Sequence, residues 1–201
     1  MLFRSVSLYV VDRTESVIRR LVDFLQTSDF AGVIFSRLAI EGTFPLERAS
    51  ISTTNYPPDL VVSLRWSAEP NEHGAPGLIT AAEGKKGRGT HASLSPFDMR
   101  NTLVASGPDF KRGLMNESPT GNIDVVPTIL WILGVNPPHT LDGRVLHEAI
   151  AGDKHSPPTP NERRIEATRD TGFFHWHQYL RFTEVGQTTY FDEGNGQPTL
   201  K

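Results

Sequence analysis

The chain has 201 residues, of which 37% are hydrophobic, and its formal net charge is −3. This length allows one domain with a sizeable core, and the weak charge gives no broad field for nucleic acid or an anionic membrane, so we expect neither as a partner. Because the sequence has no cysteine, disulfides and thiolate ligands are excluded, and a transition-metal site must use His, Asp or Glu. No basic segment leading into a long apolar stretch opens the sequence, so no signal peptide is expected and localisation stays unassigned.

The first third of the chain combines strands of a buried type with one amphipathic helix. Residues 6–11, 31–36 and 59–66 have the β-branched and aromatic content of buried strands. Between the first two, the apolar side chains of residues 17–25 fall on one side of a helix. A strand, a helix and a second strand favour a parallel βαβ unit, so we predict an α/β fold.

Residues 67–99 show no regular period, and a loop of that length is usually functional or disordered. Its Lys85, Lys86 and Arg88 could attract a phosphate-bearing substrate, but a basic run in a glycine loop is more often a solvated surface, which we prefer. Glu72 and His73 are adjacent, and adjacent side chains rarely point at one ion. We therefore interpret His73 as a surface residue.

Residues 101–106 predict a short strand, which Gly107-Pro108 would end. Residues 122–133 predict a helix that is apolar nearly all round and therefore buried against the sheet, with Gly134 as its left-handed terminal residue. Asp124 could be a metal or substrate group, but capping of this helix is the simpler interpretation. A short helix is expected over residues 145–151.

The proline-rich residues 156–160 form a linker by composition. Short strands are predicted at 165–168, 178–183 and 188–191, the last two forming a hairpin. We therefore divide the chain into an α/β part, residues 1–155, and a linker with an antiparallel extension of the same domain, residues 156–201. His175 and His177 alternate across Trp176 and would share one face of a strand, a spacing that can bind a metal. Because no carboxylate lies at a convincing offset, we interpret both histidines as packing or surface groups.

Several segments suggest a family. A glycine-rich loop ends in Gly89-Thr90-His91-Ala92 and is followed by DMRNTL at 98–103, ASGPDFK at 105–111, GNIDVVPTILWILG at 121–134 and LDGRVL at 141–146. In this order they resemble the C-terminal metal-histidine segment of the alkaline phosphatase superfamily, with the closest likeness to its type I phosphodiesterase/nucleotide pyrophosphatase-like branch. The likeness covers roughly residues 7–196. Ala92 stands where many relatives have a second glycine.

The resemblance implies a fold and a metal site. It implies part of an alkaline-phosphatase-like, mostly parallel sheet with flanking helices and a small C-terminal antiparallel hairpin. His91 would supply one ligand to a centre that holds two zinc ions in the complete enzyme, although one ligand does not separate zinc from manganese or calcium. A site built on a single imidazole should hold at most one ion, and weakly.

The other functional groups of such enzymes are a Ser or Thr nucleophile, an early Asp, an Asp-His pair and an Asp-x-x-x-His motif. Neither histidine motif occurs in the 201 residues. We therefore assign no catalytic residue and no substrate-binding residue. The chain looks like the C-terminal portion of a larger enzyme and should be inactive alone.

The expected function is that of a metal-dependent hydrolase of phosphodiester or pyrophosphate bonds, acting on a small phosphorylated or sulfated substrate. A sulfatase or phosphonate-ester hydrolase is a close alternative because the metal framework is shared. A non-catalytic α/β module that binds a partner or an oxyanion is the alternative from another class. Relatives are often exported. A sheet divided between two parts would expose an edge strand, so association through that edge is expected.

Overall fold

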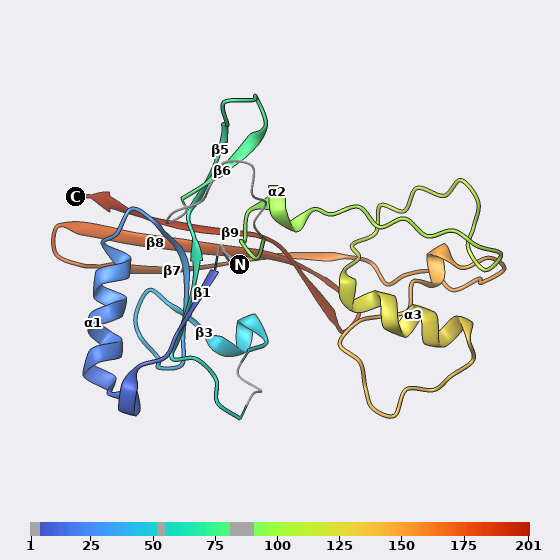
Figure 1. Cartoon of the computed structure of the whole chain (residues 1–201), viewed down its shortest axis with the longest axis horizontal. Coiled ribbons are helices and arrows are strands. Elements are labelled where there is room, and N and C mark those ends of the chain that lie inside the picture. The colour runs from blue at the N-terminus through green and yellow to red at the C-terminus, as the bar shows by residue number, and fades with distance from the viewer. Residues whose placement is uncertain (1–4, 52–54, 81–90) are drawn as a thin grey trace. The chain divides into compact units, whose positions relative to one another are not determined.

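The computed structural model describes residues 5–51, 55–80 and 91–201 (Figure 1). The predicted basic run of Lys85, Lys86 and Arg88 lies outside these residues. The chain divides into two compact units that interleave along the sequence. Unit 1 comprises Met1–Arg100, Arg164–Arg181 and Asp192–Lys201, and unit 2 comprises Asn101–Arg163 and Phe182–Phe191.

The first sheet of unit 1 has four strands in the order β1-β4-β2-β3. β4 is antiparallel to both β1 and β2, whereas β2 and β3 form a short parallel pair. β1 and β2, which the helix α1 joins, therefore run in the same direction but are not neighbours. The bounds are β1 Ser5–Leu8, α1 Glu15–Gln26, β2 Ala31–Ser36, β3 Phe44–Pro45 and β4 Leu60–Leu64, with short 3-10 turns at Val11–Arg13 and Leu46–Ala49.

The predicted α/β class, a mostly parallel sheet with flanking helices, is wrong. The described part of the chain is richer in strand than in helix, and its sheets are small and either antiparallel or mixed. The physical reason is that buried β-branched runs specify burial but not direction. β4 returns between β1 and β2, so the helical crossover does not produce a neighbouring parallel pair.

The core of unit 1 lies between α1 and the first sheet. Ile18, Val22 and Leu25 form the buried stripe of the helix, as the spacing of apolar residues predicts. They belong to one cluster with Ile34 of β2 and Leu60 of β4. Every residue of β2 is buried, so this strand is the centre of the unit.

The prediction that residues 67–99 lack regular structure is wrong where the structure describes them. β5, Trp66–Pro70, and β6, Pro76–Ile79, form an antiparallel hairpin. Its turn contains Gly74 at a φ of +79°, and the side chain of Asn71 accepts hydrogen bonds from the backbone N–H groups of His73 and Ala75. A short helix, α2, follows at Pro96–Met99.

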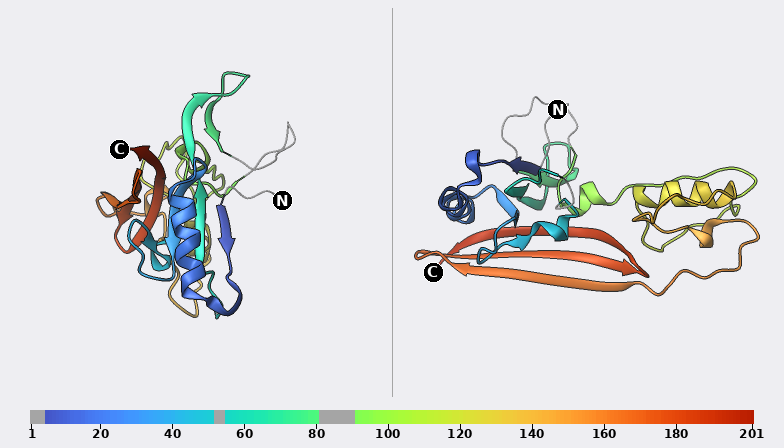
Figure 2. Two further views of the ribbon diagram at one scale, coloured as in Figure 1. Left: turned by 90° about the vertical axis from the view of Figure 1, so that its left-hand side faces the viewer. Right: turned by 90° about the horizontal axis from the view of Figure 1, so that it is seen from below.

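A third sheet contains β7, Asn161–Asp170, β8, Phe174–Val185, and β9, Thr188–Leu200. Within unit 1, β8 and β9 run beside β2 of the first sheet (Figure 2), and Trp176 of β8 belongs to the same buried cluster as Ile18 and Val22 of α1. The Gln178 side chain accepts from the N–H of Ile34 at 2.8 Å and donates to its carbonyl at 3.2 Å. A Cβ on Gly196 would lie 2.1 Å from the Gly32 carbonyl oxygen, so only glycine permits this approach of the two backbones.

Unit 2 contains the helix α3, Val125–Ile132, between the 3-10 turns η3, Asn122–Asp124, and η4, His147–Ala149. Gly134 follows α3 at a φ of +65°, as predicted. The predicted strand at 101–106 is wrong, since this segment is exposed and forms no strand. The expectation that α3 is buried all round is also wrong, because Val126 and Trp131 are 54% and 50% exposed. Among the described residues, no helix has the length and hydrophobicity needed to cross a membrane.

Candidate functional site

His91 begins a segment that is anchored to two strands of unit 1. The imidazole is exposed, whereas Ser93 and Ser95 are buried. The N–H of Leu94 donates to the Ser63 hydroxyl on β4 at 3.1 Å, and the Leu94 carbonyl accepts from the N–H of Gly194 on β9 at 2.8 Å. Leu94, three residues after His91, is therefore hydrogen-bonded to a strand of the first sheet and to a strand of the third.

The residue after His91 has an unusual backbone conformation. Ala92 has a φ of +69°, in the left-handed region that residues with a Cβ rarely occupy. Immediately beyond it, the Ser93 hydroxyl donates to the Asp98 carboxylate at 2.6 Å and accepts from the N–H of Ser95 at 3.1 Å. Ser95 then caps α2 by accepting from the N–H of Phe97. These bonds fix a tight turn directly after the histidine.

A different group of side chains has the arrangement of metal ligands. In the described residues 5–51, 55–80 and 91–201, His147, Asp153 and His155 are the one group of three whose ligand atoms all lie within 4.8 Å of one another. All three belong to unit 2. The structure does not bring His91 into a group of this kind.

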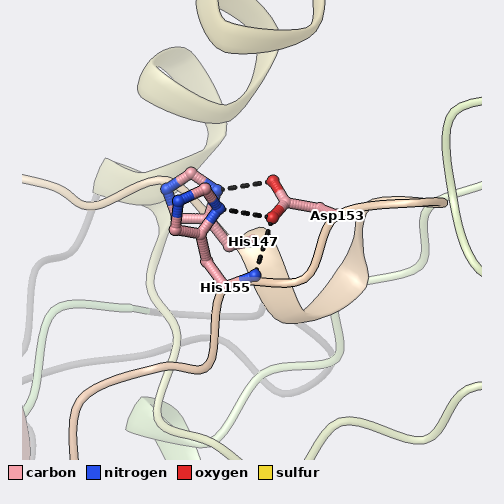
Figure 3. Close-up of side chains that lie close together, drawn as sticks. All are labelled: His147, Asp153 and His155. Carbon is pink, nitrogen blue, oxygen red and sulfur yellow. Dashed lines mark hydrogen bonds and ion pairs between the residues drawn. The ribbon is translucent and has the colours of Figure 1, made fainter.

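The two imidazole rings of His147 and His155 point at the Asp153 carboxylate (Figure 3). The Nδ1 atom of His147 lies 2.8 Å from one carboxylate oxygen, and the Nδ1 atom of His155 lies 2.6 Å from the other. The backbone N–H of His155 also donates to the carboxylate at 2.9 Å. Gly152, at a φ of +76°, provides the turn that separates η4 from Asp153.

The hydrogen bonds determine the protonation of this group, the His147–Asp153–His155 cluster. The backbone N–H of His155, together with the His147 and His155 rings, holds the pKa of Asp153 well below its usual range. At neutral pH the carboxylate is therefore ionised and can only accept hydrogen bonds. Each ring must then present a protonated Nδ1, which leaves Nε2 as the unprotonated nitrogen of a neutral ring.

The surroundings of the cluster are partly aromatic and partly open. The Trp131 ring of α3 lies edge-on to His147, with ring centroids 4.8 Å apart, and to His155 at 6.4 Å. The Asp153 side chain is only 8% exposed, whereas that of His155 is 68% exposed. The cluster is thus supported from one side and accessible through His155.

The two histidines on β8 do not form a common site. His175 pairs with Asp170 at 2.9 Å, and His177 pairs with Glu166 at 3.1 Å. Hydrogen bonds from His175 and His177 lower the pKa values of Asp170 and Glu166, respectively. Each imidazole has its own carboxylate on β7, which agrees with the interpretation as surface groups. His73 is likewise a surface residue, 81% exposed and 3.6 Å from Glu72.

Asp124 has the structural role that was predicted, but its side chain caps the turn η3 and makes no capping bond to α3 itself. Its buried carboxylate accepts from the N–H groups of Gly121 and Arg144, each at 2.8 Å, and from the Tyr190 hydroxyl at 2.9 Å. Burial and the bond to Asp124 raise the pKa of Tyr190 to about 12. Arg144 also donates to Glu148 at 2.7 Å. This network fixes the entry to α3 and is fully occupied by protein groups.

The sequence contains a signal for the cluster that differs from the Asp-His and Asp-x-x-x-His motifs. Asp153-Lys154-His155 is an Asp-x-His motif, and His147 lies six residues before the aspartate. Only the turn at Gly152 brings the first histidine back to the other two side chains.

Comparison with known proteins identifies no relative. No family model, no curated protein and no solved structure matches this chain.

Proposed function

We propose that this chain is part of a metal-dependent hydrolase of phosphodiester or pyrophosphate bonds, to which His91 contributes one metal ligand. The proposal rests on the resemblance of the segments around His91 to type I phosphodiesterases/nucleotide pyrophosphatases. The structural observation that carries it is the left-handed backbone of Ala92, at φ +69°. Members of the family that the chain resembles often have glycine at this position, and Ala92 has the backbone conformation that glycine favours.

A left-handed alanine costs roughly 1–2 kcal/mol, so a loop retains it only when its surroundings impose the turn. Here the imposed turn lies between the exposed imidazole of His91 and the buried hydroxyl of Ser93. An exposed side chain that is followed by a fixed turn suits a ligand that completes a metal site from the rim of a cleft.

The exposed apolar residues of unit 2 agree with membership in a larger protein. Leu103 and Val104 are 52% and 83% exposed, in the segment where the resemblance implies a strand. Ile129 and Trp131 of α3 are 48% and 50% exposed. Burial of such side chains is worth about 1.5–3 kcal/mol each. Cover from a preceding part of a hydrolase domain would explain why these positions are apolar.

In the proposed chemistry, a two-metal centre binds both the attacking and the leaving oxygen of the phosphoryl group. His91 would bind one of the ions through a ring nitrogen, and the other ligands and the nucleophile would come from residues that are not in this sequence. The chain alone should therefore not turn over a phosphodiester.

The coding sequence on the 5′ side of codon 1 tests the proposal. We expect the continuous reading frame to encode an Asp-x-x-x-His motif, an Asp-His pair and a Ser or Thr at the start of a helix. A frame that lacks these motifs would refute the hydrolase assignment. The 201-residue chain should also fail to hydrolyse bis(p-nitrophenyl) phosphate with zinc, and a turnover abolished by His91→Ala would contradict its predicted inactivity.

A further inference from the structure

Unit 2 contains two imidazoles and one carboxylate with no role in the hydrolase proposed above. His147, Asp153 and His155 are far in sequence from His91, and none of the segments quoted for the phosphodiesterase resemblance contains them. We propose that these three side chains bind a divalent transition-metal ion, with zinc as the expected ion. This inference does not depend on the proposed function.

The ligand types select the class of ion. Two imidazole nitrogens with one carboxylate suit zinc, cobalt, nickel or copper, whereas magnesium and calcium prefer a shell made entirely of oxygen atoms. Imidazole binds zinc at about 2.0–2.1 Å and carboxylate oxygen at about 2.0–2.2 Å. The cluster supplies three of the four positions of a tetrahedral site, and the exposed His155 leaves the fourth open to water.

The geometry is close to that of a bound site. The two Nδ1 atoms lie 2.8 Å and 2.6 Å from the Asp153 oxygens. A tetrahedral ion with the bond lengths above keeps its ligand atoms about 3.3 Å apart, so each ring must move away from the carboxylate oxygen that it now contacts. His155 has an exposed ring that can make most of this movement.

Metal binding requires a change of tautomer but no net loss of a proton from the neutral rings. The ion takes the position of the hydrogen atoms that His147 and His155 now share with Asp153. Each neutral ring then carries its proton on Nε2 instead of Nδ1. The Asp153 carboxylate changes from hydrogen-bond acceptor to ligand.

Trp131 makes the site measurable. Its ring lies 4.8 Å from the His147 ring and 6.4 Å from the His155 ring, measured between centroids. A paramagnetic ion at the cluster should therefore quench the fluorescence of this residue. The other two tryptophans, Trp66 and Trp176, belong to unit 1. The Trp131→Phe variant measures how much of the fluorescence comes from them.

The test is a titration of the metal-free chain with Zn²⁺ by calorimetry and with Co²⁺ by tryptophan fluorescence. We expect one Zn²⁺ per chain, and quenching by Co²⁺ that zinc reverses, that millimolar Mg²⁺ does not affect and that Trp131→Phe removes. Asp153→Asn and His155→Ala should weaken zinc binding about 10- to 100-fold. His155→Ala is the safer variant, because its exposed side chain contributes little to folding.

Two further variants serve as controls. His139→Ala removes an exposed histidine of the same unit and should leave zinc affinity unchanged. His73→Ala, which removes an exposed histidine of unit 1, should also leave it unchanged. Zinc binding that resists both Asp153→Asn and His155→Ala, or no binding at millimolar zinc, would overturn the inference.

Discussion

Replacement of Ala92 by glycine should stabilise unit 1. At a φ of +69° the alanine Cβ is strained, at a cost of about 1–2 kcal/mol that glycine does not incur. Glycine also adds freedom to the unfolded chain, which opposes this gain by about 0.4–1 kcal/mol. Because Ala92 is exposed and its Cβ fills no core position, the net gain in the free energy of unfolding should be about 0.5–1 kcal/mol.

Urea unfolding of wild type and variant, followed by tryptophan fluorescence, measures this difference. Ala75→Gly is a matched control in the same unit, since Ala75 is also exposed but is absent from the positions with positive φ. The control should lose up to about 1 kcal/mol through the unfolded state alone. If Ala92→Gly destabilises the chain as much as the control does, the turn after His91 is not left-handed and the structural support for a glycine-type loop fails.

Three other changes test the packing and the ionic groups. Gly143→Ala should destabilise unit 2 by about 3 kcal/mol or more, because the new Cβ would lie 2.1 Å from the Ile123 carbonyl oxygen. Gly121→Ala is the control, since its Cβ would meet only ordinary contacts from 3.4 Å. Thermal unfolding should show a much smaller loss of stability for this variant. The pKa of Tyr190 is raised to about 12 from 10.0, so stability that is present below pH 10 is lost as the pH rises towards 12, by up to roughly 2.7 kcal/mol. Tyr190→Phe should be less stable than wild type at pH 7. In urea unfolding at pH 11, the difference between the two proteins should be smaller. Burial opposes ionisation of Asp59, but the N–H of Val10 and two arginines lower its pKa below 3.8. Its contribution to the free energy of unfolding is therefore present above about pH 4 and is lost as the pH falls through the lowered pKa. Asp59→Asn should destabilise the chain by about 2 kcal/mol at pH 7 and by less below pH 3, and a destabilisation that does not change with pH would contradict the ionised state of Asp59.

Local patterns in the sequence were sufficient to locate several elements. The apolar spacing of residues 17–25 predicts α1, and the run at 31–36 predicts β2 with its observed bounds. Gly134 follows the helix as predicted, with a φ of +65°, and Gly186, with a φ of +63°, lies between the two strands of the predicted hairpin. In these places the residues that form an element also bury its apolar face or terminate it, so the signal is contained within a short window.

The sheet order could not be predicted because it depends on contacts between distant segments. β4 follows β2 by more than twenty residues and inserts between β1 and β2. β9 continues to Leu200, well past the predicted end at 191. The end was predicted too early because Gly194 and Gly196 weaken the strand pattern in the sequence. Gly196 is required by the close approach of Gly32, and that approach exists only in the folded protein.

The candidate site was likewise predictable only where the signal lies within a short stretch of sequence. Sequence reasoning selected His91 from its neighbours in the chain, and it explained Asp124 as a cap. It missed the His147–Asp153–His155 cluster because a turn, and not a fixed spacing, brings the three side chains within 4.8 Å. A search for any carboxylate within about ten residues of two histidines would have found it.

The most direct test of the central claim is the hydrolysis of bis(p-nitrophenyl) phosphate by this chain joined to the segment that its reading frame encodes upstream. With zinc, the joined protein should turn over the diester faster than p-nitrophenyl sulfate, and His91→Ala should lower kcat by about 100-fold or more because the metal centre loses a ligand. His73→Ala, which removes a surface histidine, should have no effect. Equal activity of the His91→Ala variant and the wild type would contradict the assignment of His91 as a metal ligand.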